Sequence, residues 1–233
     1  MQSIPYQEAV GCLMYLAHTT RPDIISAVIA VSQYNSCYGK QHWTAVKRIF
    51  RYLKNTTESK LQYSMSVPSG VLGYADADWG GDLDTRRSTT GYVFMSQGGP
   101  VSWSCKKQRT VALSTCEAEL MALTQATQEA VWIQRLKSEI SQDTSPILIN
   151  CDSQSALCIV ENGVINSRTK HIDIRHHFVK DQIESNVINI QYVRTEEQVA
   201  DILTKPLGPI KPVLQRQMMG LISNDNDSGG VLQ

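Results

Sequence analysis

The stretch Leu72-Gly73-Tyr74-Ala75-Asp76-Ala77-Asp78-Trp79-Gly80-Gly81 decides the fold of this chain. It predicts a buried strand that the Gly pair ends. Leu72, Tyr74 and Asp76 share one strand face because side chains alternate along a strand, so a carboxylate closes an apolar row. A buried carboxylate is costly unless a cation meets it. Taken alone, Asp76 is better interpreted as a turn cap; three further carboxylates at the ends of buried elements favour a shared role.

Alternating strand and helix patterns surround this stretch. A Gly-rich turn at residues 96–100 joins two strands into an antiparallel hairpin, and Ser114-Thr115-Cys116-Glu117 is a capping box that opens a long helix. A right-handed crossover through this helix would place Asp76 and Asp152 on neighbouring strands. We therefore expect an α/β fold with a five-stranded mixed sheet flanked by helices. Strand patterns cover residues 61–65, 71–77, 90–95, 101–106, 146–151 and 186–194, and helices are expected over 114–140, after 152, within 166–184 and around 201.

Residues 5–55 carry apolar side chains at helical spacing and predict an all-helical segment. Pro22 suits the first turn of its second helix. The third helix has a basic side, which is either a solvated face or a phosphate-contacting one; it consists of Lys47, Arg48, Arg51 and Lys54. A polar break at 55–59 then suggests a boundary. The predicted division is a helical segment 1–58, an α/β domain 59–207, and a tail 208–233 that is partly disordered.

The composition is that of an ordinary globular protein, with 42% hydrophobic and 19% charged residues. Basic and acidic residues number 22 each, so any nucleic-acid contact must come from a local patch. There is no apolar run of membrane-spanning length and no signal-peptide pattern, which predicts an intracellular protein without membrane contact. The six cysteines form no Cys-x-x-Cys pair, and we expect core thiols rather than disulfides or a zinc site.

Three more carboxylates lie at the ends of elements. Glu119 falls on the helix row that faces the sheet, whereas Glu117 lies about 200° around the axis and is better used as a cap or solvent group. The simpler alternative for Glu119 is a half-buried ion pair with a Lys or Arg. Asp152 follows a buried strand and could equally be a helix N-cap. Asp201 enters a helix after a Thr195-Glu196-Glu197-Gln198 capping pattern, where a surface carboxylate is the simpler alternative.

Four carboxylates at the ends of adjacent strands would repel one another and raise one another's pKa values. Divalent cations remove this objection, and hard oxygen ligands suit magnesium or manganese. Two such ions about 4 Å apart are the usual apparatus for hydrolysing a phosphodiester bond.

The histidines of residues 166–184 favour a different interpretation. Adjacent His176 and His177 are expected to point apart on a helix, and no cysteine helps them, so we do not predict a metal site there. A local basic patch is the preferred interpretation of this segment, which also contains Arg168, Lys170, His171 and Arg175.

From Tyr74 to Leu207 the chain resembles the ribonuclease H domain of copia-type retrotransposon polyproteins. The matching stretches are Tyr74-Ala75-Asp76-Ala77-Asp78-Trp79, Arg86-Arg87-Ser88-Thr89-Thr90-Gly91-Tyr92, Ser114-Thr115-Cys116-Glu117-Ala118-Glu119-Leu120, Asp152-Ser153-Gln154-Ser155-Ala156, Lys170-His171-Ile172-Asp173-Ile174-Arg175 and Val199-Ala200-Asp201-Ile202-Leu203-Thr204-Lys205-Pro206-Leu207. Residues 5–55 resemble the C-terminal end of the neighbouring reverse transcriptase, through Leu13-Met14-Tyr15-Leu16 and Thr20-Arg21-Pro22-Asp23.

The resemblance implies a ribonuclease H-like fold that hydrolyses the RNA strand of an RNA–DNA hybrid. The family's metal ligands fall on Asp76, Glu119, Asp152 and Asp201, with two Mg²⁺ ions as cofactors and Mn²⁺ as a substitute. Such a hybrid is read by its shape, through 2′-hydroxyls and phosphates. The implied contacts are Thr115, Cys116 and Gln154 beside the ligands, with Arg86, Lys106 and Lys107 further out.

Two departures from related patterns limit the expected activity. The loop before Asp201 lacks the mobile His of cellular ribonucleases H, which lowers the expected turnover. The catalytic Tyr-x-Asp-Asp of the polymerase is absent, so this chain alone should not polymerise DNA, and the rest of the reverse transcriptase is an expected partner. Two alternatives stay open: a non-catalytic nucleic-acid-binding or structural module, and a transposase or integrase with a three-carboxylate site, against which Asp201 and Asp152-Ser153-Gln154 count.

Overall fold

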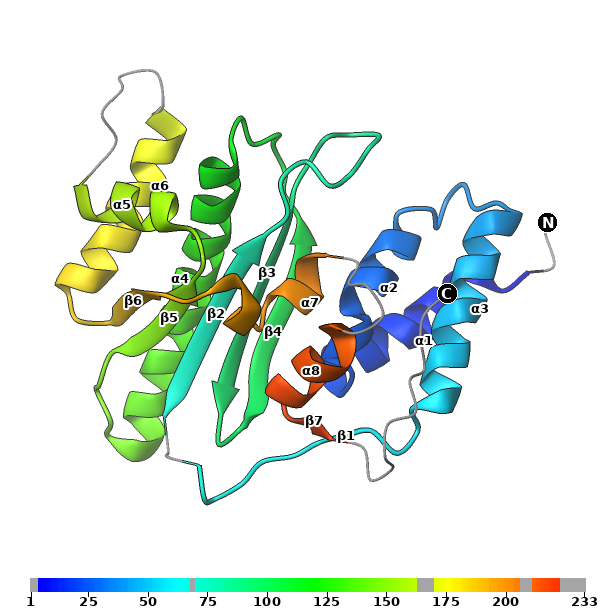
Figure 1. The fold of residues 1–233 in the computed structure, drawn as a ribbon, viewed down its shortest axis with the longest axis horizontal. Helices are drawn as coiled ribbons and strands as arrows, with labels where there is room; N and C mark the ends of the chain where they lie inside the picture. Colours follow the sequence, from blue (N-terminus) through cyan, green and yellow to red (C-terminus); the bar gives the residue numbers. More distant parts are fainter. Residues whose placement is uncertain (1–3, 68–69, 163–169, 206–210, 223–233) are drawn as a thin grey trace.

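A five-stranded mixed sheet forms the centre of the molecule (Figure 1). The computed structural model describes residues 4–67, 70–162, 170–205 and 211–222. The strand order is β4-β3-β2-β5-β6, with β2, β3 and β4 antiparallel and β2, β5 and β6 parallel. This confirms the predicted sheet and the neighbouring placement of β2, which contains Asp76, and β5, which ends just before Asp152. The strands are β2 (Val71–Ala77), β3 (Thr89–Ser96), β4 (Gly99–Lys107), β5 (Ile147–Cys151) and β6 (Ile188–Tyr192).

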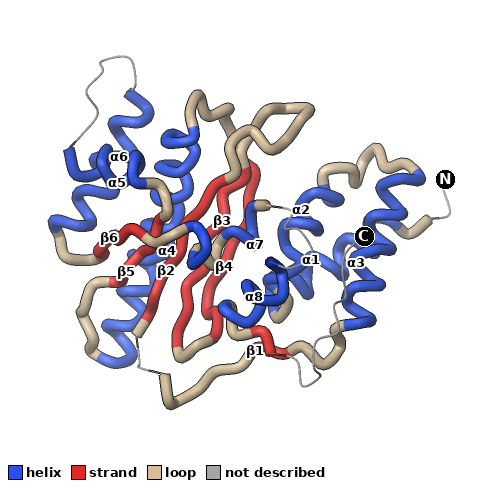
Figure 2. Tube along the Cα trace, in the orientation of Figure 1, coloured by secondary structure: helices blue, strands red, loops and turns tan. Residues whose placement is uncertain are grey.

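Three helices cover one face of the sheet (Figure 2). The alternation of side chains along β3 turns Tyr92 and Phe94 toward this face, where they pack with Leu120 and Leu123 of the long helix. Fully buried alanines at 122, 126 and 130 let that helix lie close to the strands. The helices are α4 (Thr115–Ser141), α5 (Gln154–Asn162) and α6 (Lys170–Glu184).

The opposite face of the sheet is covered by the N-terminal helices and by a short helix near Asp201. Val93 and Met95 of β3 belong to the same core cluster as Leu13, Val28 and many other buried residues of the N-terminal segment. The Trp103 indole N–H of β4 also donates a hydrogen bond to the Ala17 carbonyl, 2.8 Å away. The segment therefore shares a core with the sheet. Its elements are α1 (Tyr6–Thr19), η1 (Pro22–Ile24), α2 (Ile25–Ser32) and α3 (Lys40–Asn55), and the short helix is α7 (Asp201–Thr204), preceded by η2 (Thr195–Glu197).

The predicted tail is structured over residues 211–222. It forms α8 (Lys211–Met218) and β7 (Leu221–Ile222), and β7 pairs antiparallel with β1 (Lys60–Leu61). The predicted strand 61–65 is thus wrong beyond Leu61, because its partner is a two-residue strand. Residues 223–233, on which the prediction of disorder mainly rested, lie outside the described residues.

A buried polar network joins the C-terminal helix to the N-terminal segment. Arg216 of α8 donates to the Tyr52 hydroxyl at 2.9 Å, and this hydroxyl donates to Asp23 at 2.6 Å. Asp23 in turn pairs with Arg21 at 2.7 Å, and both side chains are buried. Burial, followed by the neighbouring Asp23 charge, raises the pKa of the Tyr52 phenol above its usual range, so Tyr52 stays a neutral donor.

The six cysteines differ in their exposure. Cys105 and Cys151 are buried thiols as expected, but Cys12, Cys37 and Cys158 are exposed, because each lies on the outer side of a helix or turn. All six are free. Among the described residues, no helix combines the length and apolarity needed to cross a membrane.

Candidate active site

Asp76 lies at the carboxyl end of β2, and its side chain is completely buried. The Thr204 hydroxyl donates a short hydrogen bond to one carboxylate oxygen, and the Lys205 ammonium lies 3.1 Å from the other. Burial raises the pKa of Asp76 to about 6, although Lys205 and Thr204 both act to lower it. The apolar row predicted from Leu72 and Tyr74 therefore does end in a carboxylate, and a lysine supplies the cation that such burial needs.

Asp201 opens α7 directly across from Asp76. Its carboxylate is 2.6 Å from the Lys205 ammonium, so this lysine bridges the two aspartates. Burial alone would lower the pKa of Lys205, but the two carboxylates outweigh it and raise that pKa above its usual value. The simpler alternative of a surface carboxylate does not hold, because Asp201 is only 2% exposed.

Gly91 is the residue that lets α7 reach this position. It pairs with Asp76 across β2 and β3. A Cβ atom at this position would come within 2.8 Å of the Leu203 Cβ and 2.7 Å of the Thr204 methyl. Only glycine leaves enough space for α7 to pack against the strand and bring Asp201 and Lys205 to Asp76.

Glu119 approaches Asp76 from the first turns of α4. Ser114 is the N-cap of α4, since its hydroxyl accepts from the Glu117 amide at 3.1 Å. The buried Glu117 carboxylate accepts from the Leu113 amide at 2.8 Å, so Glu117 supports this cap and is not a solvent group. Glu119 points inward, as its row predicted. Its Oε2 atom is buried without a hydrogen-bond partner in the part of the chain that the structure describes. Burial, then the charges of Asp76 and Asp152, raises the pKa of Glu119 to about 9.

Asp152 completes the group at the end of β5. It is not the N-cap of α5, because the Ser153 hydroxyl takes that role by accepting from the Ala156 amide at 3.2 Å. Asp152 instead accepts a hydrogen bond from the Thr195 hydroxyl at 2.9 Å. One carboxylate oxygen of Asp152 lies within 4.8 Å of a Glu119 oxygen. The structure therefore brings all four predicted carboxylates to one edge of the sheet.

These residues fit hard divalent cations. The donors are carboxylate oxygens, one of them a buried Glu119 oxygen with no partner among the described residues, and the Lys205 ammonium already lies between two of the aspartates. Cys151 also lies beside Glu119 and Asp152, but burial raises the pKa of its thiol far above the usual value, so it remains a neutral thiol. Oxygen donors without a thiolate suit magnesium or manganese.

The predicted nucleic-acid contacts fall into two groups. Thr115 and Gln154 are exposed and Cys116 is half-buried, and each lies next to the carboxylates along the chain. Arg86 and Lys106 are exposed near the end of the β3–β4 hairpin, where Lys106 pairs with Thr90. Lys107 differs from both, because it forms an ion pair with Asp82 and contacts Gln33. Its ammonium is thus used within the protein.

Sequence reasoning did not single out Lys205, Thr204 or Thr195. Lys205 follows Asp201 by four residues, and this spacing places two side chains together on a helix, so the ion pair had a visible signal. The contacts of Thr204 with Asp76 and of Thr195 with Asp152 join residues more than 40 positions apart and had no local signal.

The raised pKa of Glu119 predicts how pH affects the metal-free protein. The usual value is 4.5 and the folded value is about 9, so between these limits the folded state binds more protons than the unfolded state. The free energy of unfolding should therefore fall as pH rises through this window. Thermal melts in chelator across the window would measure this slope, and Glu119→Gln should flatten it. An unchanged slope in the variant would contradict the assignment.

The sheet order, the α4 crossover and the four convergent carboxylates define a ribonuclease H-like protein. Among solved structures, LC11-RNase H1 in complex with an RNA/DNA hybrid matches 57% of this chain and 93% of that chain, at 15% identity and a TM-score of 0.44. The foamy viral protease-reverse transcriptase in complex with an RNA/DNA hybrid matches 87% of this chain and 26% of that chain, at 14% identity and a TM-score of 0.52. No family model matches the sequence.

Sequence relatives identify the family. The chain is 42% identical over 224 residues, 96% of its length, to the retrovirus-related Pol polyprotein from transposon TNT 1-94 of Nicotiana tabacum. It is 52% identical over 133 residues to secreted RxLR effector protein 161 of Plasmopara viticola, which covers 57% of this chain and 94% of that protein. The chain belongs to the copia-type retrovirus-related Pol polyproteins. It spans 17% of the length of the tobacco polyprotein.

Proposed function

We propose that this chain is the nuclease segment of a retrotransposon polyprotein and hydrolyses the RNA strand of RNA–DNA hybrids during reverse transcription. One observation carries the proposal: Asp76, Glu119, Asp152 and Asp201 converge at one edge of the sheet, and a buried oxygen of Glu119 has no partner in the part of the chain that the structure describes. Residues 1–58 are assigned to the end of the reverse transcriptase and residues 59–207 to the nuclease. The site of action is assigned to the inside of the cell, in a cytoplasmic virus-like particle or the nucleus.

The four carboxylates would hold two Mg²⁺ ions, for which Mn²⁺ can substitute. When bound, such a pair supplies an activated water and stabilises the departing 3′ oxygen, which leaves 3′-hydroxyl and 5′-phosphate ends. The chain prepares this site before the ions arrive. Lys205 neutralises part of the charge of Asp76 and Asp201, and the Thr204 hydroxyl fixes the orientation of Asp76.

Substrate positioning falls to the exposed and half-buried residues around the carboxylates. Thr115, Cys116 and Gln154 flank Glu119 and Asp152 and are assigned to the 2′-hydroxyls and phosphates of the RNA strand. Arg86 and Lys106, at the end of the hairpin, are assigned to phosphates further along the hybrid. Lys107 is left out of this assignment because Asp82 already pairs with it.

The proposal is tested by incubating the full chain with an RNA–DNA hybrid, with single-stranded RNA and with duplex DNA, in Mg²⁺ and then in chelator. We expect cleavage of the RNA in the hybrid alone, lost in chelator and lost in Asp76→Asn, which keeps the size of the side chain. Cleavage that persists in Asp76→Asn would point to a contaminating nuclease and would contradict the proposal.

A second candidate function is a non-catalytic nucleic-acid-binding or structural module. One relative favours it: secreted RxLR effector protein 161 is named as an effector and not as a polyprotein. This chain covers 94% of the length of that protein. The same experiment separates the two candidates, because such a module would bind the hybrid without cutting it in Mg²⁺ or Mn²⁺. Polymerase activity is not proposed, since the sequence has no Tyr-x-Asp-Asp motif.

A further inference from the structure

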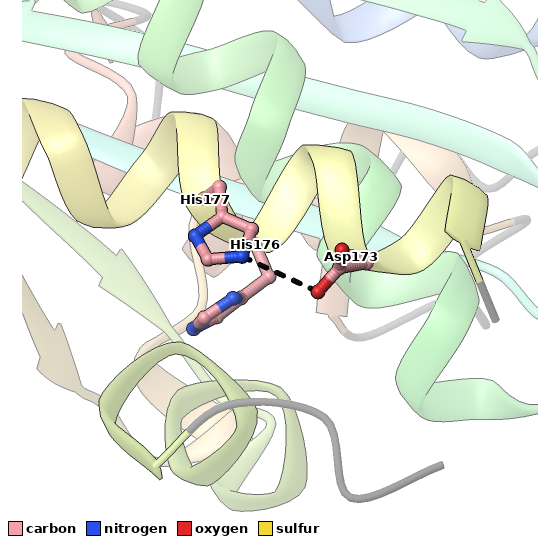
Figure 3. A group of neighbouring side chains, drawn as sticks. All are labelled: Asp173, His176 and His177. Atoms are coloured by element: carbon pink, nitrogen blue, oxygen red, sulfur yellow. Dashed lines mark ion pairs between the residues drawn. The ribbon is translucent and has the colours of Figure 1, made fainter. Parts of the chain in front are cut away.

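A second group of metal-ligating side chains lies on α6, which does not contribute to the carboxylate site. Asp173, His176 and His177 gather on one side of this helix (Figure 3). One ligand atom from each of the three lies within 4.8 Å of the other two. The two imidazole rings have centroids 4.9 Å apart with planes inclined by 60°. The prediction that adjacent His176 and His177 point apart is therefore wrong, because both rings lie on the same side of α6.

His176 is the unusual member of this group. It is only 3% exposed, and neither of its ring nitrogens has a hydrogen-bond partner among the residues that the structure describes. A neutral imidazole carries one donor and one acceptor, and burying both unpaired is unfavourable. Buried polar groups of this kind call for an explanation such as a missing ion. One of these nitrogens is the atom that lies within 4.8 Å of the Asp173 and His177 ligand atoms.

An ion pair within α6 explains only part of the arrangement. His177 Nε2 lies 3.4 Å from Asp173 Oδ1, one helical turn away, and both side chains are more than half exposed. Such a pair contributes little at a solvated surface. It also leaves both nitrogens of His176 without a partner among the described residues, so a ligand that engages all three side chains accounts for more of the observations.

We propose that Asp173, His176 and His177 form a binding site for a borderline divalent transition-metal ion, with Zn²⁺ as the best fit. Imidazole nitrogens and one carboxylate oxygen are ligands that zinc accepts, whereas magnesium prefers oxygen alone. Zinc–ligand bonds of about 2.0–2.2 Å in a tetrahedron place the donor atoms roughly 3.4 Å apart. The His177–Asp173 separation of 3.4 Å already matches this spacing. Solvent would supply the fourth ligand beside the exposed His177.

The site would act separately from the carboxylate site and would hold the first turns of α6. A metal that binds the folded chain stabilises it by mass action. Zinc at this position gives the buried His176 ring a partner while α6 stays packed against α4 and α5. The proposal does not depend on the nuclease activity.

The test measures zinc binding to the full chain by equilibrium dialysis in excess Mg²⁺. All measurements use a protein that carries Asp152→Asn, so that zinc at the carboxylate site does not add to the result. Glu119, Cys151 and Asp152 form the only other group of possible metal ligands in the described residues. In this background, a second substitution, His177→Ala or Asp173→Asn, should weaken the binding of one zinc ion at least about tenfold. Even the loss of a residue that only hydrogen-bonds to a metal ligand lowers metal affinity by about that factor. His18→Ala, an exposed histidine on α1, is the matched control and should leave binding unchanged.

The imidazole NMR signals show whether the buried ring takes part. One equivalent of Zn²⁺ should shift the signals of His176 and His177 and leave those of His18 and His42 in place. Zinc binding that His177→Ala does not weaken would overturn the proposal. Zinc binding that leaves the His176 signal unmoved would also overturn it, because the site would then be only the exposed pair.

Discussion

Replacing Asp201 by Asn is expected to lower cleavage of the RNA strand at least about 100-fold in Mg²⁺. Changing a residue that only hydrogen-bonds to a metal ligand typically lowers activity by about 10- to 100-fold, and changing a ligand itself should cost more. The carboxylate is only 2% exposed and faces Asp76 through the shared Lys205. Asparagine keeps the shape but removes one charge from the set that would hold the two cations. Initial rates of hybrid cleavage measure the loss, and binding of the hybrid in chelator should persist.

Asp143→Asn is the matched control for this prediction. Asp143 is a carboxylate that pairs with Lys137 at 3.1 Å beyond the far end of α4, away from the cluster. Its replacement should leave the cleavage rate unchanged. A melting temperature near that of the parent would show that Asp201→Asn still folds, and parental cleavage by that folded variant would remove Asp201 from the site.

Asp76 and Glu119 could be found from the sequence because their signals are local, whereas Asp152 and Asp201 depended on the resemblance to the copia-type polyproteins. Asp76 ends an apolar strand row, and Glu119 shares a helix face with buried alanines, so periodicity alone directs both side chains inward. The placement of Asp76 and Asp152 on neighbouring strands could be predicted because crossover connections between parallel strands are right-handed. The cation between Asp76 and Asp201 could not be predicted, because the contact of Lys205 with Asp76 depends on how α7 packs over Gly91.

The relation between the N-terminal helices and the sheet could not be predicted from the sequence. A polar break at residues 55–59 is typical of a domain boundary, and it led to a division at residue 58. In the structure the helices before this break and β3 and β4 after it bury their apolar side chains in one cluster. Sequence periodicity shows that a helix has an apolar face but does not identify the surface that covers it.

A chain that lacks residues 1–57 is therefore expected not to fold cooperatively. The truncation would expose Val93, Cys105 and Leu203, which are at most 1% exposed in the intact structure. It would also remove the Ala17 carbonyl that accepts from Trp103, and it would leave Arg216 without its Tyr52 partner. Circular dichroism during heating measures the outcome, and a cooperative melt with hybrid cleavage by the truncated chain would contradict the shared core.

A single substitution tests the same point without removing any element. Leu13 of α1 is fully buried in the shared core, and Leu13→Ala should lower the free energy of unfolding by about 2–5 kcal/mol. The neighbouring Cys12 is exposed, so Cys12→Ala should have little effect. Because the helices and the sheet share one core, tryptophan fluorescence, which includes Trp103 on β4, should report the same lowered transition as circular dichroism. A helix transition that shifts while the sheet transition stays in place would show two independent units.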